Sequence, residues 1–537
     1  MSLTRRRLLK LTGLLGAGSA LPSSASAQAR RVAPAAPPPP SIYESIGVKP
    51  LINGRGTFTI IGGSIELPEV RTAKSAANQQ YAQLDELMEA VGKRLGELTG
   101  AEWGMVSAGC AAAMSHATAA CVAGGNPDLH VRIPNLAGFQ KDEVIIPAHS
   151  RNVYDAAIRA VGVKVIEVDS PDALQLAIGP KTAMIYIFAG PRTDSGPMST
   201  EAICTIARRQ NVPVFVDAAA EILTIPNVHL QRGATLVGYS GGKYIRGPQS
   251  AGLLLGRKDL VRAAWVHSAP HHGYARAMKV GREEIVGMLV AVESWVTRDH
   301  AAEWKQWVAR ADYIAGYMES VPGVRTIVQR DPDEGLSNRS PRISIRWNAG
   351  ERGLTGAEAA DLLYRTEPRI ALNASGRAPA GQESAGDTGV AVVTAMLAEG
   401  DEKVVAQRIA GLLRETRPPR AAEPIAAPGA DLGGRWEVEI TYSASKTTHT
   451  LHLQQRGARL EGMHQGDFLT RDIAGTINGD TVSLASVVTE RHGDALTYRF
   501  TGKVSGDTIA GSLDMGEYLG AAWTARRAGP RSAASGL

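Results

Sequence analysis

The sequence contains very little cysteine. Only Cys110, Cys121 and Cys204 occur among its 537 residues, and each lies in an apolar stretch. An odd number of scattered cysteines excludes a disulfide framework. The lack of a C-x-x-C pair argues against a thiol redox motif and a zinc site, so we expect no bound metal.

Long apolar runs are also missing. No stretch approaches the ~20 consecutive apolar residues of a membrane-spanning helix. The composition, 44% hydrophobic and 21% charged, is close to the globular average, which excludes a disordered, collagen-like or coiled-coil chain. A length of 537 residues is too great for one ordinary core, so two or three domains are expected.

The net charge is small, and its excess lies at one end of the chain. The formal charge is +5, from 58 Lys+Arg against 53 Asp+Glu. Residues 1–27 hold four basic residues (Arg5, Arg6, Arg7 and Lys10) and no acidic one, which leaves 54 basic against 53 acidic residues elsewhere. A nearly neutral mature chain argues against a nucleic-acid partner.

Residues 1–27 have the plan of a twin-arginine-type signal peptide. Paired arginines precede Leu8-Leu9-Lys10, an apolar stretch runs from Leu11 to Leu21, and Ala25-Ser26-Ala27 is an A-x-A cleavage site. The apolar stretch is too short to span ~30 Å of hydrocarbon. We predict export by the twin-arginine machinery, cleavage near Ala27, a periplasmic location and no membrane span in the mature chain.

Two regions rich in proline and alanine divide the rest of the chain. Residues 28–40 predict a stiff polyproline-like tether, and residues 415–430 predict a linker. Residues 41–290 alternate apolar runs with helical periods, which predicts an α/β domain whose parallel sheet is covered on both faces. Residues 291–414 predict a smaller α+β domain. Strands are expected at 144–146, 163–168, 183–188, 212–216, 235–239 and 252–255, and helices at 84–98, 152–161 and 200–210.

Beyond residue 430 the hydrophobic period changes to two. Trp436-Glu437-Val438-Glu439-Ile440 alternates apolar and polar residues, and Asn478-Gly479-Asp480 and Ser505-Gly506-Asp507 are turn signals. Residues 431–527 therefore predict an antiparallel β-sandwich or small β-barrel. Residues 528–537 are expected to form a disordered tail.

The segment Tyr239-Ser240-Gly241-Gly242-Lys243 carries the clearest chemical signal. It is not a phosphate loop, because it is one residue short of the pattern and lacks the Ser/Thr that holds magnesium. It matches the G-x-S-x-G pattern of a serine-hydrolase elbow at Ser240, although Gly-Pro follows where a helix should begin. It also suits a Schiff-base lysine, since glycines beside Lys243 let a planar group approach the backbone.

An aldehyde cofactor such as pyridoxal phosphate needs an acid, an anion site and a flat cover for its ring. Asp217 ends an apolar strand at the edge where α/β sheets bind ligands, so its carboxylate can face the pyridine nitrogen. His149 follows another strand and can lie on the ring. A small-residue turn that opens a helix, with Ser240 in addition, can bind the phosphate; the turn comprises Ser107, Ala108, Gly109, Cys110 and Ala111.

The same segments resemble a known family. The sequence is similar to the selenocysteine synthase-like branch of fold type I pyridoxal-phosphate enzymes, and above all to the D-glucosaminate-6-phosphate ammonia lyase group. The similar stretches cover residues 42–300 well and 300–415 loosely, and the unit at 431–527 lies outside them. They include Gly62-Gly63-Ser64, Leu98–Glu102, Ser107–Ala113, His149–Asp155, Val216–Glu221, Ser240–Lys243, Arg246–Ser250 and Lys279–Glu284.

This resemblance implies a fold and a set of roles. The fold is α/β, with a large domain of the aspartate aminotransferase (PLP-dependent transferase) type and a smaller α+β domain, to which the C-terminal antiparallel β domain is added. Lys243 is implied to form the Schiff base, Asp217 to pair with the pyridine nitrogen and His149 to stack on the ring. The family also implies a homodimer or larger homo-oligomer.

The predicted function is that of an exported lyase acting on a small amino acid or amino-sugar acid by α,β-elimination. Arg246, Arg282 and Arg377 are candidates to bind the substrate carboxylate, because guanidinium binds carboxylates in a bidentate way. A racemase, an aminotransferase and a selenium-transferase-like β-replacement enzyme begin with the same carbanion and stay open. Two further alternatives are a serine hydrolase at Ser240 and a non-catalytic envelope-binding protein.

Overall fold

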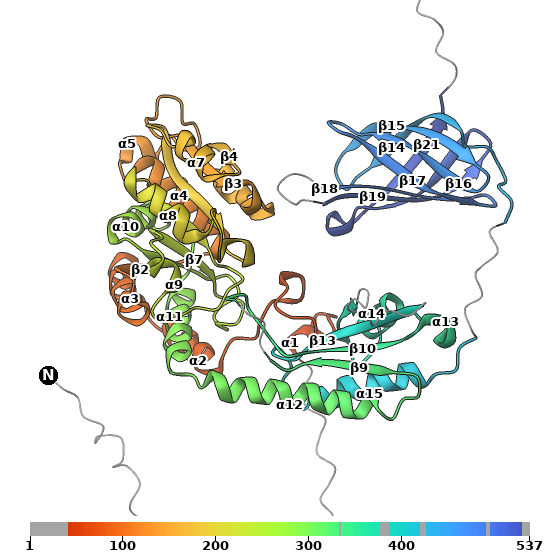
Figure 1. The fold of residues 1–537 in the computed structure, drawn as a ribbon, viewed down its shortest axis with the longest axis horizontal. Coiled ribbons are helices and arrows are strands. Elements are labelled where there is room, and N and C mark those ends of the chain that lie inside the picture. The colour runs from red at the N-terminus through yellow and green to blue at the C-terminus, as the bar shows by residue number, and fades with distance from the viewer. Residues whose placement is uncertain (1–40, 332–334, 376–385, 419–425, 490–494, 529–537) are drawn as a thin grey trace, which may run out of the picture. The chain divides into compact units, whose positions relative to one another are not determined.

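The computed structural model describes residues 41–331, 335–375, 386–418, 426–489 and 495–528 (Figure 1). The predicted signal peptide and tether, and all but the first residue of the predicted tail, lie outside these ranges. The chain divides into two units, Met1–Pro50 and Leu51–Leu537. In the described part of the first unit, a single turn of helix, α1 (Ile42–Ser45), begins with a capping box between Ser41 and Glu44.

The largest sheet has seven strands in the order β2-β8-β7-β6-β5-β3-β4. Most of its residues are buried, because the strands are continuous runs of apolar residues covered on both faces. All six strands expected from the sequence of this region are present. The seven are β2 (Trp103–Ser107), β3 (Glu143–Pro147), β4 (Lys164–Val168), β5 (Thr182–Phe188), β6 (Val214–Asp217), β7 (Leu236–Ser240) and β8 (Gly252–Gly256).

Strand β8 departs from the expected all-parallel arrangement. It pairs antiparallel with both β2 and β7, whereas the other four neighbouring pairs are parallel. The connection from β7 to β8, residues 241–251, holds no helix and is too short for a crossover, so the chain must turn back. Because β6 and β7 are parallel, Asp217 and the loop that carries Lys243 still leave the same edge of the sheet.

Helices pack against this sheet. The buried helix α4 (Cys110–Ala123) contacts strands β5 to β8, and its many alanines allow close approach. Helix α3 (Leu84–Thr99) contacts β2 and buries Met88, Val91 and Leu95, which recur at helical spacing on one face. The helix predicted at 152–161 is shorter than expected, since a 3-10 turn precedes α6 (Ala156–Arg159). The others are α2 (Pro68–Ala77), α5 (Pro127–His130), α7 (Pro171–Ala177), α8 (Thr200–Arg209), α9 (Val228–Gln231), α10 (Lys258–Val266) and α11 (Arg282–Thr297).

Residues from His300 to Arg414 form a second core around a four-stranded antiparallel sheet of order β12-β13-β10-β9. Helix α12 packs on β9, β10 and α15, and α14 packs on β12 and β13. The elements are α12 (His300–Met318), β9 (Arg325–Gln329), β10 (Arg342–Asn348), α13 (Ala349–Arg352), α14 (Gly356–Arg365), β12 (Asn373–Ser375), β13 (Asp387–Val393) and α15 (Asp401–Arg414). Two short strands, β1 (Ile52–Asn53) and β11 (Ile370–Ala371), pair in parallel.

The C-terminal residues form a closed eight-stranded antiparallel barrel, which decides between the two predicted architectures. Apolar residues alternate with exposed polar ones along each strand, because one face points inward. The strands are β14 (Gly434–Thr441), β15 (Lys446–Arg456), β16 (Arg459–Gln465), β17 (Thr470–Asn478), β18 (Thr481–Thr489), β19 (Ala495–Ser505), β20 (Thr508–Asp514) and β21 (Gly520–Arg527). Across the described ranges, no helix combines the length and apolarity needed to cross a bilayer.

Candidate active site

Lys243 lies three residues after strand β7 ends at Ser240. Its ammonium group is largely enclosed. Burial lowers the pKa of Lys243 below its ordinary value, and the nearby Asp217 carboxylate and Cys110 thiol partly oppose this effect. A lysine with a lowered pKa holds a larger neutral, nucleophilic fraction at neutral pH.

Close backbone packing surrounds the lysine. A Cβ atom added at Gly63 would lie 2.7 Å from the carbonyl oxygen of Gly242, and the φ of Gly63 is +66°. The Ser64 amide donates to the same carbonyl at 3.2 Å. The segment from Gly62 to Ser64 therefore packs directly against the loop that carries Lys243, and glycine is required at Gly63 for this contact.

Asp217 ends strand β6 and is 2% exposed. Its Oδ1 accepts hydrogen bonds from the Ala219 amide at 3.0 Å and the Cys110 thiol at 3.4 Å, and its Oδ2 accepts one from the Tyr186 hydroxyl at 3.0 Å. Burial raises the pKa of Asp217 above its ordinary value, although these donors and Lys243 favour the carboxylate. Because two carboxylate oxygens accept about four hydrogen bonds, Asp217 can accept one more.

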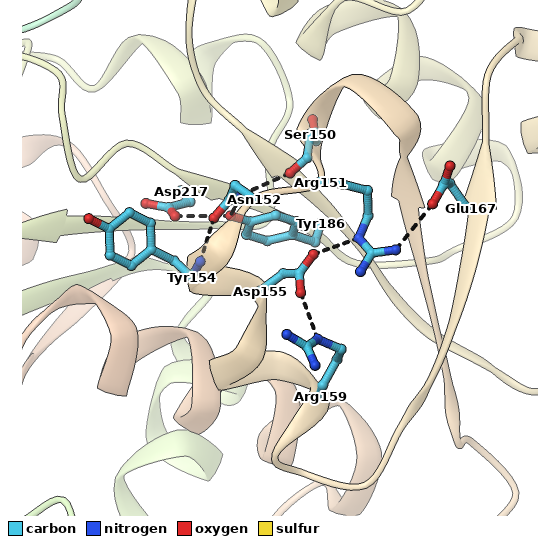
Figure 2. Close-up of polar contacts among 9 residues, drawn as sticks. All are labelled: Ser150, Arg151, Asn152, Tyr154, Asp155, Arg159, Glu167, Tyr186 and Asp217. Atoms are coloured by element: carbon cyan, nitrogen blue, oxygen red, sulfur yellow. Dashed lines mark hydrogen bonds and ion pairs between the residues drawn. The ribbon is translucent and has the colours of Figure 1, made fainter. Parts of the chain in front are cut away.

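The Asp217 carboxylate ends a hydrogen-bonded chain that Figure 2 shows. The Tyr186 hydroxyl, on the neighbouring strand β5, donates to Asp217 and accepts from Asn152 Nδ2 at 2.9 Å. The same amide group donates to the Ser150 carbonyl at 2.9 Å. The chain thus ties the segment after β3 to the carboxylate. The sequence analysis did not identify Tyr186. The one sign of it in the sequence is a tyrosine within the apolar run 183–188.

A buried ion-pair cluster fixes the same segment. Asp155 is fully buried and pairs with Arg151 at 2.6 Å and Arg159 at 2.8 Å, and Arg151 also pairs with Glu167 at 3.1 Å (Figure 2). Burial alone would raise the pKa of Asp155, but the hydrogen bonds and charges of the two arginines lower it. The cluster therefore ties the residues that follow His149 to helix α6 and, through Glu167, to strand β4.

His149 lies in a 3-10 turn that directly follows β3 and is half-buried. Its Nε2 is buried and has no hydrogen-bond partner within the described ranges. Burial and the charge of Arg192 lower the pKa of His149, so the ring is neutral at pH 7. A neutral ring with a vacant nitrogen is suited to lie against a planar polar ligand.

The predicted anion site is the turn Ser107–Ala111 between β2 and α4. Gly109 has a φ of +92°, which favours glycine, and no side chain of the described residues caps the helix. A Cβ atom added at Gly252 would lie 2.6 Å from the Cys110 nitrogen, so β8 closely supports the helix start. The first amides of α4 are therefore open to an anion, which the helix dipole also attracts.

Ser240 does not lie in a nucleophile elbow. Strand β7 ends at Ser240, and residues 241–251 turn back into β8 without a helix. An elbow needs a helix immediately after the nucleophile. The antiparallel return of β8 removes that helix, so the geometry does not favour the hydrolase alternative. Ser240 stays a predicted phosphate ligand.

The three arginines predicted to bind a carboxylate have different surroundings. Arg246 has a φ of +59°, its Nε donates to the Ile65 carbonyl at 3.1 Å, and burial lowers its pKa. Arg282 Nε donates to the Ala77 carbonyl at 3.2 Å, at the end of helix α2. Arg377 lies outside the described residues. Carboxylate binding by these arginines stays a prediction.

Among the residues that the structure describes, no group of three or more His, Cys, Asp or Glu side chains is placed to hold a metal. His267 stacks on His130 with ring centroids 4.4 Å apart, and burial lowers the pKa of His267 to about 3. His271 contacts Asp85 at 3.2 Å. These histidines therefore have packing and pairing roles in the described fold.

The chain is similar in sequence and in fold to known proteins. The chain is 30% identical over 328 residues to D-glucosaminate-6-phosphate ammonia lyase of Salmonella typhimurium (strain 14028s / SGSC 2262), covering 59% of this chain and 85% of the relative. It is 30% identical over 347 residues to 5'-C-glycyluridine monooxygenase-decarboxylase of Streptomyces sp, covering 62% and 83%. A solved structure of D-glucosaminate-6-phosphate ammonia lyase matches with a TM-score of 0.60 and 28% identity, over 70% of this chain and 98% of that one. No protein-family model matches.

The fold and the comparisons define a pyridoxal-phosphate-dependent enzyme of fold type I. The chain belongs to the selenocysteine synthase-like, D-glucosaminate-6-phosphate ammonia lyase-like family of these enzymes. The predictions of family, fold class, enzyme class and cofactor are thereby confirmed.

The residues present fit pyridoxal phosphate on three observations. The start of α4 is uncapped, Asp217 is buried with a further acceptor position, and His149 has a buried nitrogen without a partner. Ser107–Ala111 would hold the phosphate, Asp217 the pyridine nitrogen, Lys243 the aldehyde carbon and His149 the ring face. These individual roles stay predictions.

Proposed function

We propose that this enzyme is a lyase that deaminates an amino acid or amino-sugar acid by α,β-elimination. The observation that carries the proposal is a half-buried lysine near a buried carboxylate, Lys243 and Asp217, in a chain 30% identical to an ammonia lyase. The two residues leave neighbouring parallel strands, β7 and β6, at the same edge of the sheet.

When bound, pyridoxal phosphate supplies an electron sink for negative charge at the substrate α-carbon. Lys243 Nζ removes the α-proton, and the lowered pKa favours the neutral amine that this step needs. Asp217 holds a proton on the pyridine nitrogen by its negative charge. The β-hydroxyl leaves as water with the proton that Lys243 removed, and the enamine that remains is hydrolysed by water to a 2-oxo acid and ammonia.

A screen of D- and L-amino acids and aminosugar acids for ammonia release tests the reaction. Purified enzyme loaded with cofactor is expected to release ammonia and a 2-oxo acid in equal amounts from at least one β-hydroxylated compound. Boiled enzyme and substrates without a β-hydroxyl are the controls.

Other outcomes would assign another reaction of the same cofactor. Racemisation without ammonia would replace the lyase by a racemase. Ammonia-free exchange of the amino group or of the β-substituent would indicate an aminotransferase or a β-replacement enzyme. Oxygen consumption would indicate chemistry closer to that of the Streptomyces relative.

We further propose that the enzyme is exported to the periplasm by the twin-arginine machinery. The support is the sequence of residues 1–27, with Arg6 and Arg7 ahead of an apolar stretch. Changing both Arg6→Lys and Arg7→Lys is expected to retain the protein in the cytoplasm, because receptors read the arginine pair. Cell fractionation measures this, with Lys10→Arg as the matched control. Unchanged periplasmic protein in the double variant would contradict the proposal.

We also propose a homo-oligomer, as is usual for fold type I enzymes. Light scattering of the purified enzyme measures its mass in solution, and a monomer at working concentration would contradict this proposal.

A further inference from the structure

The Asp217 carboxylate is enclosed by protein, yet the role proposed for it depends on its charge. It is 2% exposed, and burial raises its pKa, which favours the neutral acid. The positive charge of Lys243 opposes this effect, but Lys243 is also the residue proposed to bind the cofactor. Other groups around Asp217 are therefore needed to keep it ionised in spite of its burial.

Both oxygens of Asp217 contact groups that can donate hydrogen bonds. Oδ1 accepts from the Ala219 amide at 3.0 Å and from the Cys110 thiol, a weak donor, at 3.4 Å. Oδ2 lies 3.0 Å from the Tyr186 hydroxyl, which as a phenol can either donate or accept. A donating phenol stabilises the carboxylate, whereas an accepting phenol stabilises the neutral acid. The direction of this one hydrogen bond therefore affects the charge of Asp217.

The Asn152 side chain has a fixed orientation, because backbone groups hold both of its polar atoms (Figure 2). Its Oδ1 accepts from the Tyr154 amide at 2.8 Å, and its Nδ2 donates to the Ser150 carbonyl at 2.9 Å. Exchanging the two atoms would place oxygen against a carbonyl and nitrogen against an amide N–H. The NH₂ group of Asn152 therefore faces the Tyr186 hydroxyl, with 2.9 Å between nitrogen and oxygen.

This orientation fixes the direction of the Tyr186 hydrogen bonds. An amide NH₂ group has no acceptor, so Asn152 can only donate to the phenol oxygen. Tyr186 is fully buried, and burial raises its pKa well above the ordinary value, so the hydroxyl keeps its proton. Among the described residues, its hydrogen-bonding partner that can accept this proton is Asp217 Oδ2. The phenol therefore donates to Asp217, and donors face both carboxylate oxygens.

We propose that Asn152 and Tyr186 are positioning residues that keep Asp217 ionised. Asn152 directs the Tyr186 proton toward Asp217, and the phenol stabilises the negative charge there. Neither side chain needs to contact substrate or cofactor for this effect. The inference rests on the proposed function, in which Asp217 holds a proton on the pyridine nitrogen, and it adds which residues maintain the charge for that role.

The proton affinity of Asp217 in the full-length, cofactor-free enzyme tests the proposal. Carbon-13 NMR of protein labelled at its aspartate carboxyl groups measures it against pH, and the Asp217 signal is assigned by its loss in Asp217→Asn. Tyr186→Phe is expected to raise the proton affinity of Asp217 at least about tenfold, because a hydrogen bond to a charged group contributes this much. The measurement needs no substrate, so its result is independent of which reaction the enzyme catalyses.

Asn152→Asp is expected to reverse the hydrogen bonds of Tyr186. The new carboxylate can still accept from the Tyr154 amide, but it also accepts from the phenol, which can then accept a proton from Asp217. The added charge raises the proton affinity of Asp217 as well, so a double-variant cycle with Tyr186→Phe is needed to separate the two effects. The rise caused by Asn152→Asp is expected to be at least about tenfold larger with Tyr186 present than in Tyr186→Phe.

Asn135→Asp is the matched control, because Asn135 also accepts from the amide two residues later, at 3.2 Å, but is exposed. It should leave the proton affinity of Asp217 and turnover unchanged. If Asn152→Asp does not fold, Asn152→Ala replaces it: freeing the phenol should raise the proton affinity with Tyr186 present and leave it unchanged in Tyr186→Phe. The proposal is overturned if Tyr186→Phe has no effect on Asp217, or if the Asn152 variant acts equally with and without Tyr186.

Discussion

Replacing Lys243 with alanine is expected to reduce turnover by at least about 10³-fold, because it removes both the covalent attachment of the cofactor and the base for the α-proton. Proton transfer by a positioned base alone is worth about 10²–10⁴-fold. The purified wild-type enzyme should be yellow, and borohydride reduction should attach the cofactor permanently to Lys243. The variant should not retain cofactor after reduction and denaturation. Peptide mass mapping measures the attachment, and the ammonia assay measures turnover.

Lys258→Ala is the matched control for this variant. Lys258 is exposed at the start of helix α10 and lies on the same domain, so its loss should leave colour and turnover unchanged. Full activity of Lys243→Ala, or borohydride labelling of another lysine, would overturn the assignment of Lys243. A colourless wild-type preparation that pyridoxal phosphate cannot reconstitute would overturn the Schiff-base role altogether.

Asp217→Asn is expected to lower turnover by about 10²–10³-fold, the usual loss when one preorganised electrostatic group is removed from an active site. The substitution keeps the size of the side chain but removes the negative charge. The same change should lower the pKa of Lys243 further in the cofactor-free protein, because Asp217 favours the lysine ammonium. The rate at which Lys243 condenses with an aldehyde, followed against pH, measures that pKa.

Two comparisons separate the charge of Asp217 from its structural role. Asp259→Asn changes an exposed aspartate at the start of α10 and should leave turnover unchanged. Tyr186→Phe removes one donor to Asp217 but keeps the charge, so it should cost far less than Asp217→Asn. Equal turnover in Asp217→Asn and wild-type enzyme would contradict the predicted contact with the pyridine nitrogen.

The candidate active-site residues that could be predicted from the sequence are those whose position follows from the local pattern of strands, turns and helices. Asp217 ends an apolar strand, and Lys243 follows the next strand after two glycines. Because parallel neighbouring strands end at one edge of a sheet, the two were expected to meet there, and β6 and β7 are parallel. The turn at Ser107–Ala111 was visible as small residues ahead of a helix.

The supporting residues could not be predicted in the same way. Tyr186 and Asn152 act through contacts between segments far apart in the chain, and no local periodicity encodes those contacts. The direction of β8 depends on whether residues 241–251 cross over the sheet or turn back, and its apolar composition suits either choice.

The strand order of the barrel predicts the order in which its strands pair during folding. Each strand from β15 to β21 pairs with the strand before it, and β14 with β21 is the single pairing that joins the two ends of the unit. Local hairpins form in about 1–10 μs, whereas joining distant segments costs loop entropy. The pairings between consecutive strands are therefore expected to form first, and the pairing of β14 with β21 is expected to form last. Because the first and last strands are neighbours, a circular permutant opened at any hairpin would retain every strand pairing.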